Sequence, residues 1–558
     1  MKKGAFAGFF LAALLAAAIF RLAGLGLRPM HHDEANQALK FGALLEQGEY
    51  RYDKTDHHGP SLYYFSLPIA WISAENTLAG LSEASLRTVT AVFGLGTLLL
   101  LLLFVPFLER RAVAAAALCL AVSPVMIYFS RFYIQESLLV FFLTGFLAAV
   151  WRYLQRPGFC WAVAAGIFAG LMYTTKETAV IAYAAAGAAL LLTILIPGKG
   201  KERKSFFPKN PPQEVDERKG KSRPDEINES GADPGGAARP QHARWGHLIL
   251  AVAAALGVSF LLFSSFLQNL GGFWDSILSF RVYFIRAGEG GFHVHPWHYY
   301  LQTIALSKPK AGPLWTEGII LILALAGCGA AWKRRPAGGR DARFPKFLVF
   351  YTALSAAAYS LVSYKTPWNV LPFYLGFILL AGLGLSLIFD LTRRRLLRLS
   401  VIFLLTAAFL HLGIQSYRAN FIYPADPRNP YVYAQTTADF LKLVRRVEEI
   451  ASYHPDHRNI LIKVIAGPYE TWPLPWYLRS FGRVGYWTSV EEAGDLGSPP
   501  LIVASAEEAL KLEAVLNTMY RSEYYGLRPG VLLALHVRDD IWESVFIRRP
   551  EPGGESRK

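Results

Sequence analysis

Long apolar stretches recur along this 558-residue chain, and they restrict its fold more than any other feature. A helix needs about 20 predominantly apolar residues to cross a bilayer. Stretches near that length number about eleven, and a shorter one at 61–74 is expected to re-enter the membrane or to lie at its interface. The sequence therefore predicts a polytopic α-helical membrane protein, with spans near 4–27, 86–108, 112–130, 137–153, 159–174, 178–197, 246–267, 314–332, 346–363, 370–390 and 399–415.

The charge pattern predicts how these spans are oriented. Only 18% of the residues are charged, yet the net charge is +15, and Lys and Arg gather in alternate connecting segments. Basic loops of membrane proteins remain in the cytoplasm, which predicts a cytoplasmic N-terminus in a plasma-membrane protein. This explanation of the positive charge makes nucleic acid an unexpected partner. The basic segment 198–245, rich in Pro, Gly and both charge signs, is predicted to be a disordered cytoplasmic loop.

The last part of the chain, 416–558, has a different pattern from the membrane domain 1–415. Short apolar runs at 459–465, 501–505 and 531–537 are typical of buried strands, and 506–520 is typical of a helix. Alternating strands and helices predict a small α/β domain. By the same charge rule, this domain is expected outside the cytoplasm.

The densest group of reactive side chains follows the first span, in the predicted outer loop 28–85. His31-His32-Asp33-Glu34 places two carboxylates side by side. Such groups can act as a general base or bind a divalent cation such as Mg²⁺, Mn²⁺ or Zn²⁺. Alternatively, Asp33 is the N-cap of an amphipathic helix over 34–47, and both roles can hold together.

A second pair of histidines, His57 and His58, lies farther along this loop in Asp56-His-His-Gly-Pro60. His57 is a candidate to join Asp33 and Glu34 as a metal ligand, although the spacing of the histidines matches no zinc pattern. Interfacial histidines that hydrogen-bond the backbone or a phosphate are the alternative.

Three short turns on the predicted outer side carry charges where the spans end. Arg131 and Glu136 lie in one turn, Lys176 in the second and Lys365 in the third. Ionisable groups close to a bilayer are costly and indicate function. These basic side chains could clamp a phosphate at the membrane surface, or each could simply extend its charge into the interface.

Aromatic and histidine side chains are concentrated in a fourth outer loop, 268–313. Its Phe292-His-Val-His-Pro-Trp-His298 could supply ligands or stack on a sugar, and Trp472 of the α/β domain is a similar candidate. An interfacial aromatic belt with ordinary loop packing would give the same pattern, and we favour that interpretation.

The order of these motifs resembles the GT-C superfamily of membrane glycosyltransferases, especially its protein O-mannosyltransferase and aminoarabinose transferase branch. The similarity extends to the Agl-type, flippase-associated subfamily. His58 stands where the family has lysine, Glu136 where it has aspartate, and Glu177 where it has glycine. The resemblance is carried by Asp33-Glu34, His58-Gly-Pro-Ser-Leu-Tyr-Tyr64, Arg131 with Glu136, Lys176, Lys365-Thr-Pro-Trp-Asn-Val-Leu-Pro372, Asn429-Pro-Tyr-Val-Tyr433 and Trp472-Pro-Leu-Pro-Trp-Tyr477.

The resemblance implies an enzyme that transfers a sugar from a polyprenyl-phosphate donor to a glycan, lipid or protein acceptor at the outer face of the membrane. Asp33 would deprotonate the acceptor, and Glu34 and Glu136 would orient it or hold a divalent cation. The lipid phosphate would be neutralised by His58, Arg131, Lys176 and Lys365.

Two other functions are compatible with the sequence. A flippase for lipid-linked sugars, or a flippase accessory protein, would need no transfer chemistry, but transporters usually carry internal repeats and charges near the bilayer midplane. No such repeat is evident in the sequence. A scaffold whose outer domain binds a partner in the cell envelope is the third possibility.

Overall fold

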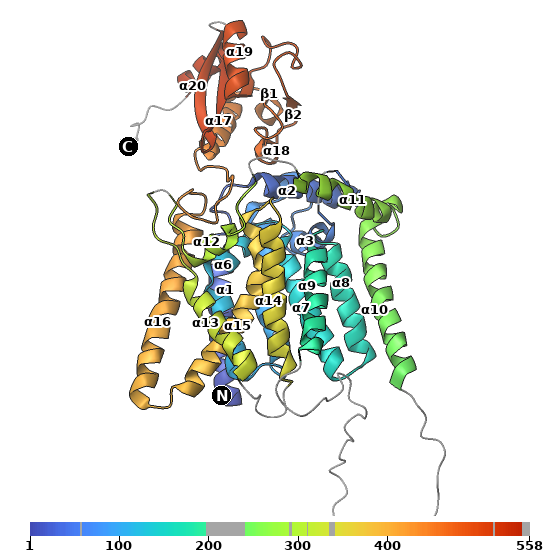
Figure 1. Ribbon diagram of the computed structural model, residues 1–558. Helices are drawn as coiled ribbons and strands as arrows, with labels where there is room; N and C mark the ends of the chain where they lie inside the picture. Colours follow the sequence, from blue (N-terminus) through green and yellow to red (C-terminus); the bar gives the residue numbers. More distant parts are fainter. Residues whose placement is uncertain are drawn as a thin grey trace, which may run out of the picture.

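The computed structural model describes residues 1–55, 58–196, 240–288, 293–309, 311–333, 341–516 and 519–548. Figure 1 shows a bundle of helices with a small α/β domain standing on one end, which we call the domain end. The N-terminus lies at the opposite end of the bundle.

The predicted spans all coincide with helices. Six described helices are long and apolar enough to cross a membrane, or seven if α5 and α6, which meet at 62°, form one broken span. The expected number of eleven is not confirmed, because α8, α9 and α13 are shorter apolar helices. The bundle comprises α1 (Lys3–Leu22), α4 (Glu83–Leu100), α5 (Arg110–Val122), α6 (Pro124–Ser130), α7 (Glu136–Gln155), α8 (Phe159–Tyr173), α9 (Ala179–Leu195), α10 (Pro240–Phe263), α13 (Gly318–Lys333), α14 (Arg343–Leu361), α15 (Leu371–Leu391) and α16 (Arg395–Tyr417).

The break between α5 and α6 has a local cause. Pro124 is the first residue of α6 and has no backbone N–H to continue the helix, while the Ser123 hydroxyl accepts a hydrogen bond from the Met126 N–H. The predicted span over 112–130 is therefore bent at this point.

Burial separates the core of the bundle from its periphery. In α15, 83% of the most apolar window is buried, compared with 11% in α10 and 6% in α16. α15 packs closely on α13, where a Cβ on Gly384 would overlap the Leu323 carbonyl oxygen. The exposed apolar faces of the peripheral helices are the surfaces suited to lipid.

Besides the helices of the α/β domain, four described helices lie outside the bundle proper: α2 (His32–Gln47), α3 (Ser61–Ile72), α11 (Gly271–Gly288) and α12 (Tyr299–Ala305). Figure 1 shows α2 and α11 lying across the domain end. The loops predicted to share one face, 28–85 and 268–313, therefore do so. The sequence did not predict α11, because its apolar residues are interrupted by polar and charged ones.

The α/β domain contains a five-stranded sheet in the order β2-β1-β3-β5-β4. β1 runs parallel to β2 and β3, whereas β5 is antiparallel to β3 and β4. Helices α17 (Phe440–Tyr453), α19 (Ala506–Leu516) and α20 (Asp539–Arg548) pack on it. The strands are β1 (Leu461–Ile465), β2 (Arg483–Trp487), β3 (Leu501–Ser505), β4 (Tyr520–Arg528) and β5 (Val531–Arg538).

The three predicted strands are confirmed as β1, β3 and β5, the central strands of this sheet. The sequence missed β2 and β4, which lie at its two edges. Edge strands are partly solvated and need no continuous apolar run. The helix predicted over 506–520 is shorter, ending at Leu516, and residues 517–518 lie outside the described residues.

Two predicted boundaries change. Residues 240–245 of the expected disordered loop form the start of α10, and 198–239 lie outside the described residues. At the other boundary, α16 continues past residue 416 into a π-helical turn, η5 (Arg418–Ile422). The α/β domain therefore begins later than the predicted boundary.

Side-chain hydrogen bonds connect the α/β domain to the start of the first outer loop. The Tyr477 hydroxyl accepts from the Met30 N–H at 2.9 Å. Gln435 and Thr436 donate to the carbonyl oxygens of Pro29 and Met30 at 2.8 and 2.7 Å. These contacts fix the chain immediately before α2, the helix that carries Asp33.

Candidate active site

Asp33 lies in the first turn of α2, with its side chain 41% exposed. The N-cap is His31 and not Asp33, because the His31 ring accepts the Asp33 backbone N–H through Nδ1 at 3.0 Å. His31 Nε2 then donates to the Tyr433 carbonyl oxygen at 3.0 Å, which places the proton of the neutral ring on Nε2. The predicted Asp33 cap was wrong, and the Asp33 carboxylate is available for chemistry.

Glu34, the neighbouring carboxylate, has a different environment. It is fully buried, and Arg87 of α4 binds both of its oxygens at 2.7 Å. It also accepts the backbone N–H groups of His31 and Tyr133 at 3.0 and 2.9 Å. Burial alone would raise the pKa of Glu34, but Arg87 and then Arg28 outweigh it and lower the pKa to about 2. Glu34 is therefore a permanently charged anchor of α2.

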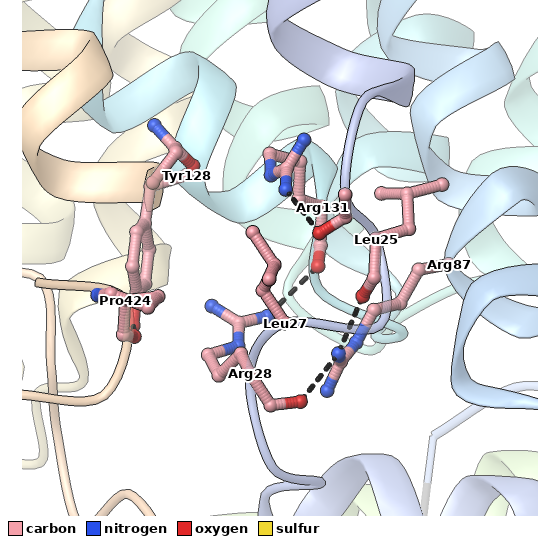
Figure 2. A pocket seen from close by; sticks show the side chains of 9 residues that line it. Leu25, Leu27, Arg28, Arg87, Tyr128, Arg131 and Pro424 are labelled. Carbon is pink, nitrogen blue, oxygen red and sulfur yellow. Dashed lines mark hydrogen bonds between the residues drawn. The ribbon is translucent and has the colours of Figure 1, made fainter. Parts of the chain in front are cut away.

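Arg131 contacts the end of α1. Its guanidinium donates to the carbonyl oxygens of Phe20 at 2.8 Å, Ala23 at 2.6 Å and Gly24 at 2.9 Å. Figure 2 shows this guanidinium directed at the chain just after α1. An arginine in this position satisfies the last carbonyls of a helix, whose negative dipole end favours a cation. The geometry of Arg131 is that of a helix cap rather than of a phosphate clamp.

Glu136 and Lys176 form a buried ion pair, with exposed side-chain fractions of 2% and 5%. Glu136 begins α7, and Lys176 lies in the turn between α8 and α9. The Lys176 ammonium also donates to the Asn369 side-chain oxygen at 3.2 Å. Asn369 lies in the 3₁₀ helix η4 (Pro367–Val370), at the end of the third charged turn, so side-chain contacts through Lys176 join all three turns predicted to meet.

His58 pairs with Glu177, since its Nδ1 lies 2.8 Å from the Glu177 carboxylate. His58 and Glu177 are two of the positions at which the chain departs from the pattern that the resemblance implies, and their side chains contact each other. The loop is held against this turn by Ser61, whose N–H donates to the Thr174 carbonyl at 3.0 Å. A Cβ on Gly59 would overlap that same carbonyl oxygen, so this close approach requires glycine. His57 lies outside the described residues.

Lys365 is 1% exposed and lies four residues before Asn369. Its ammonium donates to the carbonyl oxygens of Val362 and His295 at 2.5 and 2.9 Å. Both contacts are single hydrogen bonds to backbone. The third charged turn thus approaches the loop that carries His293 and His295.

A cluster of imidazole and phenol groups beside Asp33 was not predicted as part of the site. His293 Nδ1 lies 2.7 Å from the Tyr433 hydroxyl, and His295 Nε2 lies 3.5 Å from it. Burial lowers the pKa of His293, although the nearby Asp33 carboxylate opposes this. Burial, and then Lys365, lowers the pKa of His295. Both imidazoles are therefore neutral at pH 7.

The sequence contained a signal for this cluster, because the histidine-rich loop and Asn429-Pro-Tyr-Val-Tyr433 were both noted. The loop-packing interpretation holds for both histidines: His293 packs on Tyr364 at 4.6 Å between ring centroids, and His295 stacks on Tyr299 at 4.3 Å. What the sequence could not reveal was that this packing lies beside Asp33. Trp297 of the same loop is 68% exposed.

Trp368 connects the Asp33 cluster with the ion pair. Its ring contacts His31 at 5.9 Å and Tyr433 at 5.9 Å, both edge-on. The next residue, Asn369, receives the hydrogen bond from Lys176. η4 therefore contacts both Lys176 and His31, the N-cap of the helix that carries Asp33.

The predicted metal ligands are not assembled in this geometry. Glu34 is paired with Arg87 and Glu136 with Lys176, so neither carboxylate is directed at a common point with Asp33. Within the described ranges, no three His, Cys, Asp or Glu side chains are grouped to hold a metal ion. The residues present do not fit a divalent cation bound by Asp33, Glu34 and Glu136.

Part of the chain matches a known protein family in sequence. Residues 12–204 match the family model of dolichyl-phosphate-mannose-protein mannosyltransferases. This segment contains Asp33, Glu34, His58, Arg131, Glu136 and Lys176. No curated protein sequence matches the chain.

Solved structures match over nearly the whole chain. ArnT from Cupriavidus metallidurans in the apo state is 14% identical with a TM-score of 0.59, covering 95% of this chain and 98% of that one. Its structure bound to undecaprenyl phosphate has a TM-score of 0.57 at 14% identity, covering 97% and 99%. The Archaeoglobus fulgidus oligosaccharyltransferase in complex with Zn and sulfate has a TM-score of 0.50 at 12% identity, covering 96% and 76%. The expected resemblance to the GT-C glycosyltransferases is thereby confirmed, in fold over the whole chain and in sequence over residues 12–204.

Proposed function

We propose that the protein is a membrane glycosyltransferase that moves a sugar from a polyprenyl-phosphate donor to an acceptor at the domain end of the bundle. The observation that carries this proposal is that a partly exposed carboxylate and a buried ammonium lie on elements joined by η4: Trp368 contacts His31, the N-cap of the Asp33 helix, and Asn369 binds Lys176. Sugar transfer from a lipid phosphate needs both: a base for the acceptor and a cation for the departing phosphate. The family match of residues 12–204 supports the same chemistry.

Asp33 is the base in this proposal. It accepts the proton of an acceptor O–H or N–H, and the acceptor atom forms a bond to the anomeric carbon of the sugar. The bond from that carbon to the phosphate oxygen breaks, and its electron pair leaves with the polyprenyl phosphate. Neutral His293 and His295, connected through the Tyr433 hydroxyl, border Asp33 without a fixed charge that would compete for the acceptor.

Lys176 and Lys365 stabilise the negative charge that develops on the leaving phosphate. Each ammonium is held by a few contacts to oxygen atoms, which phosphate oxygens can replace. Glu136 holds Lys176 in position, and His58 is the further candidate for contact with the phosphate. Glu34 and Arg131 are assigned to the support of α2 and α1, on the contacts described above.

The undecaprenyl phosphate in the ArnT complex supports a polyprenyl-phosphate donor for this chain. The acceptor class remains a glycan, a lipid or a protein. We place the domain end outside the cytoplasm of a plasma-membrane protein, with 416–558 extracytoplasmic and the N-terminus cytoplasmic. The separation of the N-terminus from the α/β domain in Figure 1 supports this arrangement.

The test uses purified protein in lipid nanodiscs with a panel of polyprenyl-phosphate sugars and a crude glycan and protein extract as acceptor. The readout is release of polyprenyl phosphate. Loss of the base in Asp33→Asn should lower turnover at least about 100-fold, the usual contribution of general base catalysis. The control is Asp53→Asn, an exposed carboxylate of the same loop, which should leave turnover unchanged.

Full turnover in Asp33→Asn would disprove the assigned base. Translocation of the lipid-linked sugar that persists in this variant, with no turnover in the wild type, would instead favour the flippase. Repeating the assay with a chelator separates a cation-dependent reaction from one carried by the side chains alone.

A further inference from the structure

A pocket between α1 and η5 gathers three arginines from distant parts of the sequence. Arg28 follows α1, Arg87 lies in α4 and Arg131 follows α6. Figure 2 shows the three side chains around this pocket, with Tyr128 and Pro424 on its opposite side. The ring of Tyr128, Asn420 of η5 and the exposed Leu27 complete its lining.

The arginines exceed the acidic charge available to them here. Glu34 contacts Arg87 at 2.7 Å and Arg28 at 3.6 Å. Among the described ion pairs, it is the carboxylate that contacts this group of three guanidinium groups. Arg87 and Arg28 share this one carboxylate, and Arg131 has no carboxylate contact within the described residues, so positive charge exceeds negative charge in a buried region. Unbalanced buried charge is unfavourable, and an anion would relieve it.

Arg28 is the arginine with a donor still available. Arg87 and Arg131 direct their guanidinium groups to backbone carbonyls, including those of Leu25, Arg28 and Gly24, and Arg28 donates through Nη2 to the Arg131 carbonyl at 2.8 Å. Arg28 is 6% exposed, and its Nε is buried without a hydrogen-bond partner. Its guanidinium is held between the rings of Phe132 and Tyr128, at 4.4 and 4.8 Å from their centroids. These rings hold the guanidinium in place through cation–π contacts.

The size and surroundings of the pocket indicate the ligand. Its interior volume is about 10 Å³, which suits one water-sized group, such as a single oxygen of a larger anion. The remainder of that anion would stay at the mouth, where Leu27 is 56% exposed. The lining residue Asn420 belongs to η5, where Ile422 and the preceding Tyr417 are also more than half exposed. An apolar chain could lie along this surface.

We propose that this pocket binds the phosphate group of an anionic membrane lipid, with one phosphate oxygen on Arg28 and the acyl chains beside Leu27 and η5. This lipid is separate from the sugar donor, whose phosphate is assigned to Lys176 and Lys365. Phe132, which packs on Arg28, also packs on His31, the N-cap of the helix that carries Asp33. Arg28 precedes α2 by a few residues and contacts Glu34. The bound lipid therefore stabilises the start of α2, the helix that carries Asp33.

The test measures lipid retention and needs no enzymatic activity, so it can fail or succeed independently of the proposed transferase function. The full-length protein is equilibrated in mixed phosphatidylcholine and phosphatidylglycerol, and the retained lipid is counted by native mass spectrometry. The wild type should retain phosphatidylglycerol selectively. In Arg28→Gln, the apparent affinity for it should fall about tenfold, equivalent to about 1.4 kcal/mol.

The matched control is Arg418→Gln, an exposed arginine of η5 in the same region. It should change retention less than about twofold, because screened surface charges contribute little. Equal losses in the two variants, or no selectivity in the wild type, would overturn the proposal. If Arg28→Gln does not fold, Leu27→Trp keeps the guanidinium and narrows the mouth, and unchanged retention in that variant would count against the site.

Inorganic phosphate distinguishes a free anion from a lipid headgroup. Added to the same preparation, it should not displace phosphatidylglycerol from the wild type, since it lacks the acyl chains. Displacement by phosphate alone, dependent on Arg28, would show a site for free phosphate and would overturn the lipid assignment.

Discussion

Arginines and lysines form separate clusters at the domain end, and the two clusters are bound in different ways. Arg87 donates two hydrogen bonds to Glu34 and others to backbone carbonyls, and Arg131 caps α1. Lys176 has one carboxylate and one amide oxygen as partners. Lys365 is held by two backbone carbonyls.

The difference follows from the chemistry of the two side chains. A guanidinium presents several donors in a rigid plane and makes many simultaneous contacts, whereas an ammonium is a point charge on a flexible stem. Arginine is suited to building the support, and lysine to a charge whose partners change during a reaction. Substitutions in the two clusters should therefore separate stability from turnover.

The largest expected effect is on stability. Glu34→Gln leaves Arg87 buried without a charge partner, which should destabilise the protein by about 3–5 kcal/mol. Thermal unfolding in nanodiscs measures this. Glu49→Gln in the same loop is the control: its carboxylate pairs with the exposed Arg51, and a change within about 1 kcal/mol is expected. Equal effects of the two substitutions would contradict the assigned anchor role.

The same pair should give a pH signature. The pKa of Glu34 is about 2 in the folded protein, below the ordinary value of 4.5. A carboxyl group whose pKa is lowered by folding stabilises the folded state. Its contribution is complete above the pKa of the unfolded chain and is lost as the pH falls from 4.5 towards 2. The difference in Tm between wild type and Glu34→Gln should be constant from pH 7 to about 5 and shrink below that. A difference that persists unchanged at pH 3 would contradict this.

The lysine cluster should affect turnover. Lys176→Gln should lower turnover about 100-fold, as for the loss of one electrostatic contact to a developing anion. The substitution also leaves Glu136 unpaired, so the double variant Glu136→Gln/Lys176→Gln is needed. It should regain thermal stability but not turnover. Recovery of turnover in the double variant would mean that Lys176 only neutralises Glu136.

The smallest expected effect concerns the cluster beside Asp33. Tyr433→Phe removes the hydroxyl between His293 and His295 while retaining the ring against Trp368. The loss of one neutral hydrogen bond should lower turnover by less than about tenfold. The informative measurement is the pH dependence of turnover. Its acid side should change, because the neutral histidines that contact the Tyr433 hydroxyl border Asp33. An unchanged profile would indicate packing alone.

The membrane fold and the order of the charged turns could be predicted from the sequence, because apolar length and the distribution of Lys and Arg are properties of the chain itself. The central strands β1, β3 and β5 were visible for the same reason, as short buried runs. The edge strands β2 and β4, and the helix α11, lack such runs and were missed.

The roles within the site depended on tertiary contacts that sequence distance conceals. Asp33 and Glu34 are adjacent in the sequence, yet one is partly exposed and the other is held by Arg87, 53 residues away. Arg131 and Lys176 looked equivalent, but only packing made the first a helix cap and the second part of an ion pair. Local composition determined where charge meets the membrane, whereas only the folded chain decided which charges are already neutralised, because pairing depends on side chains brought together from separate helices.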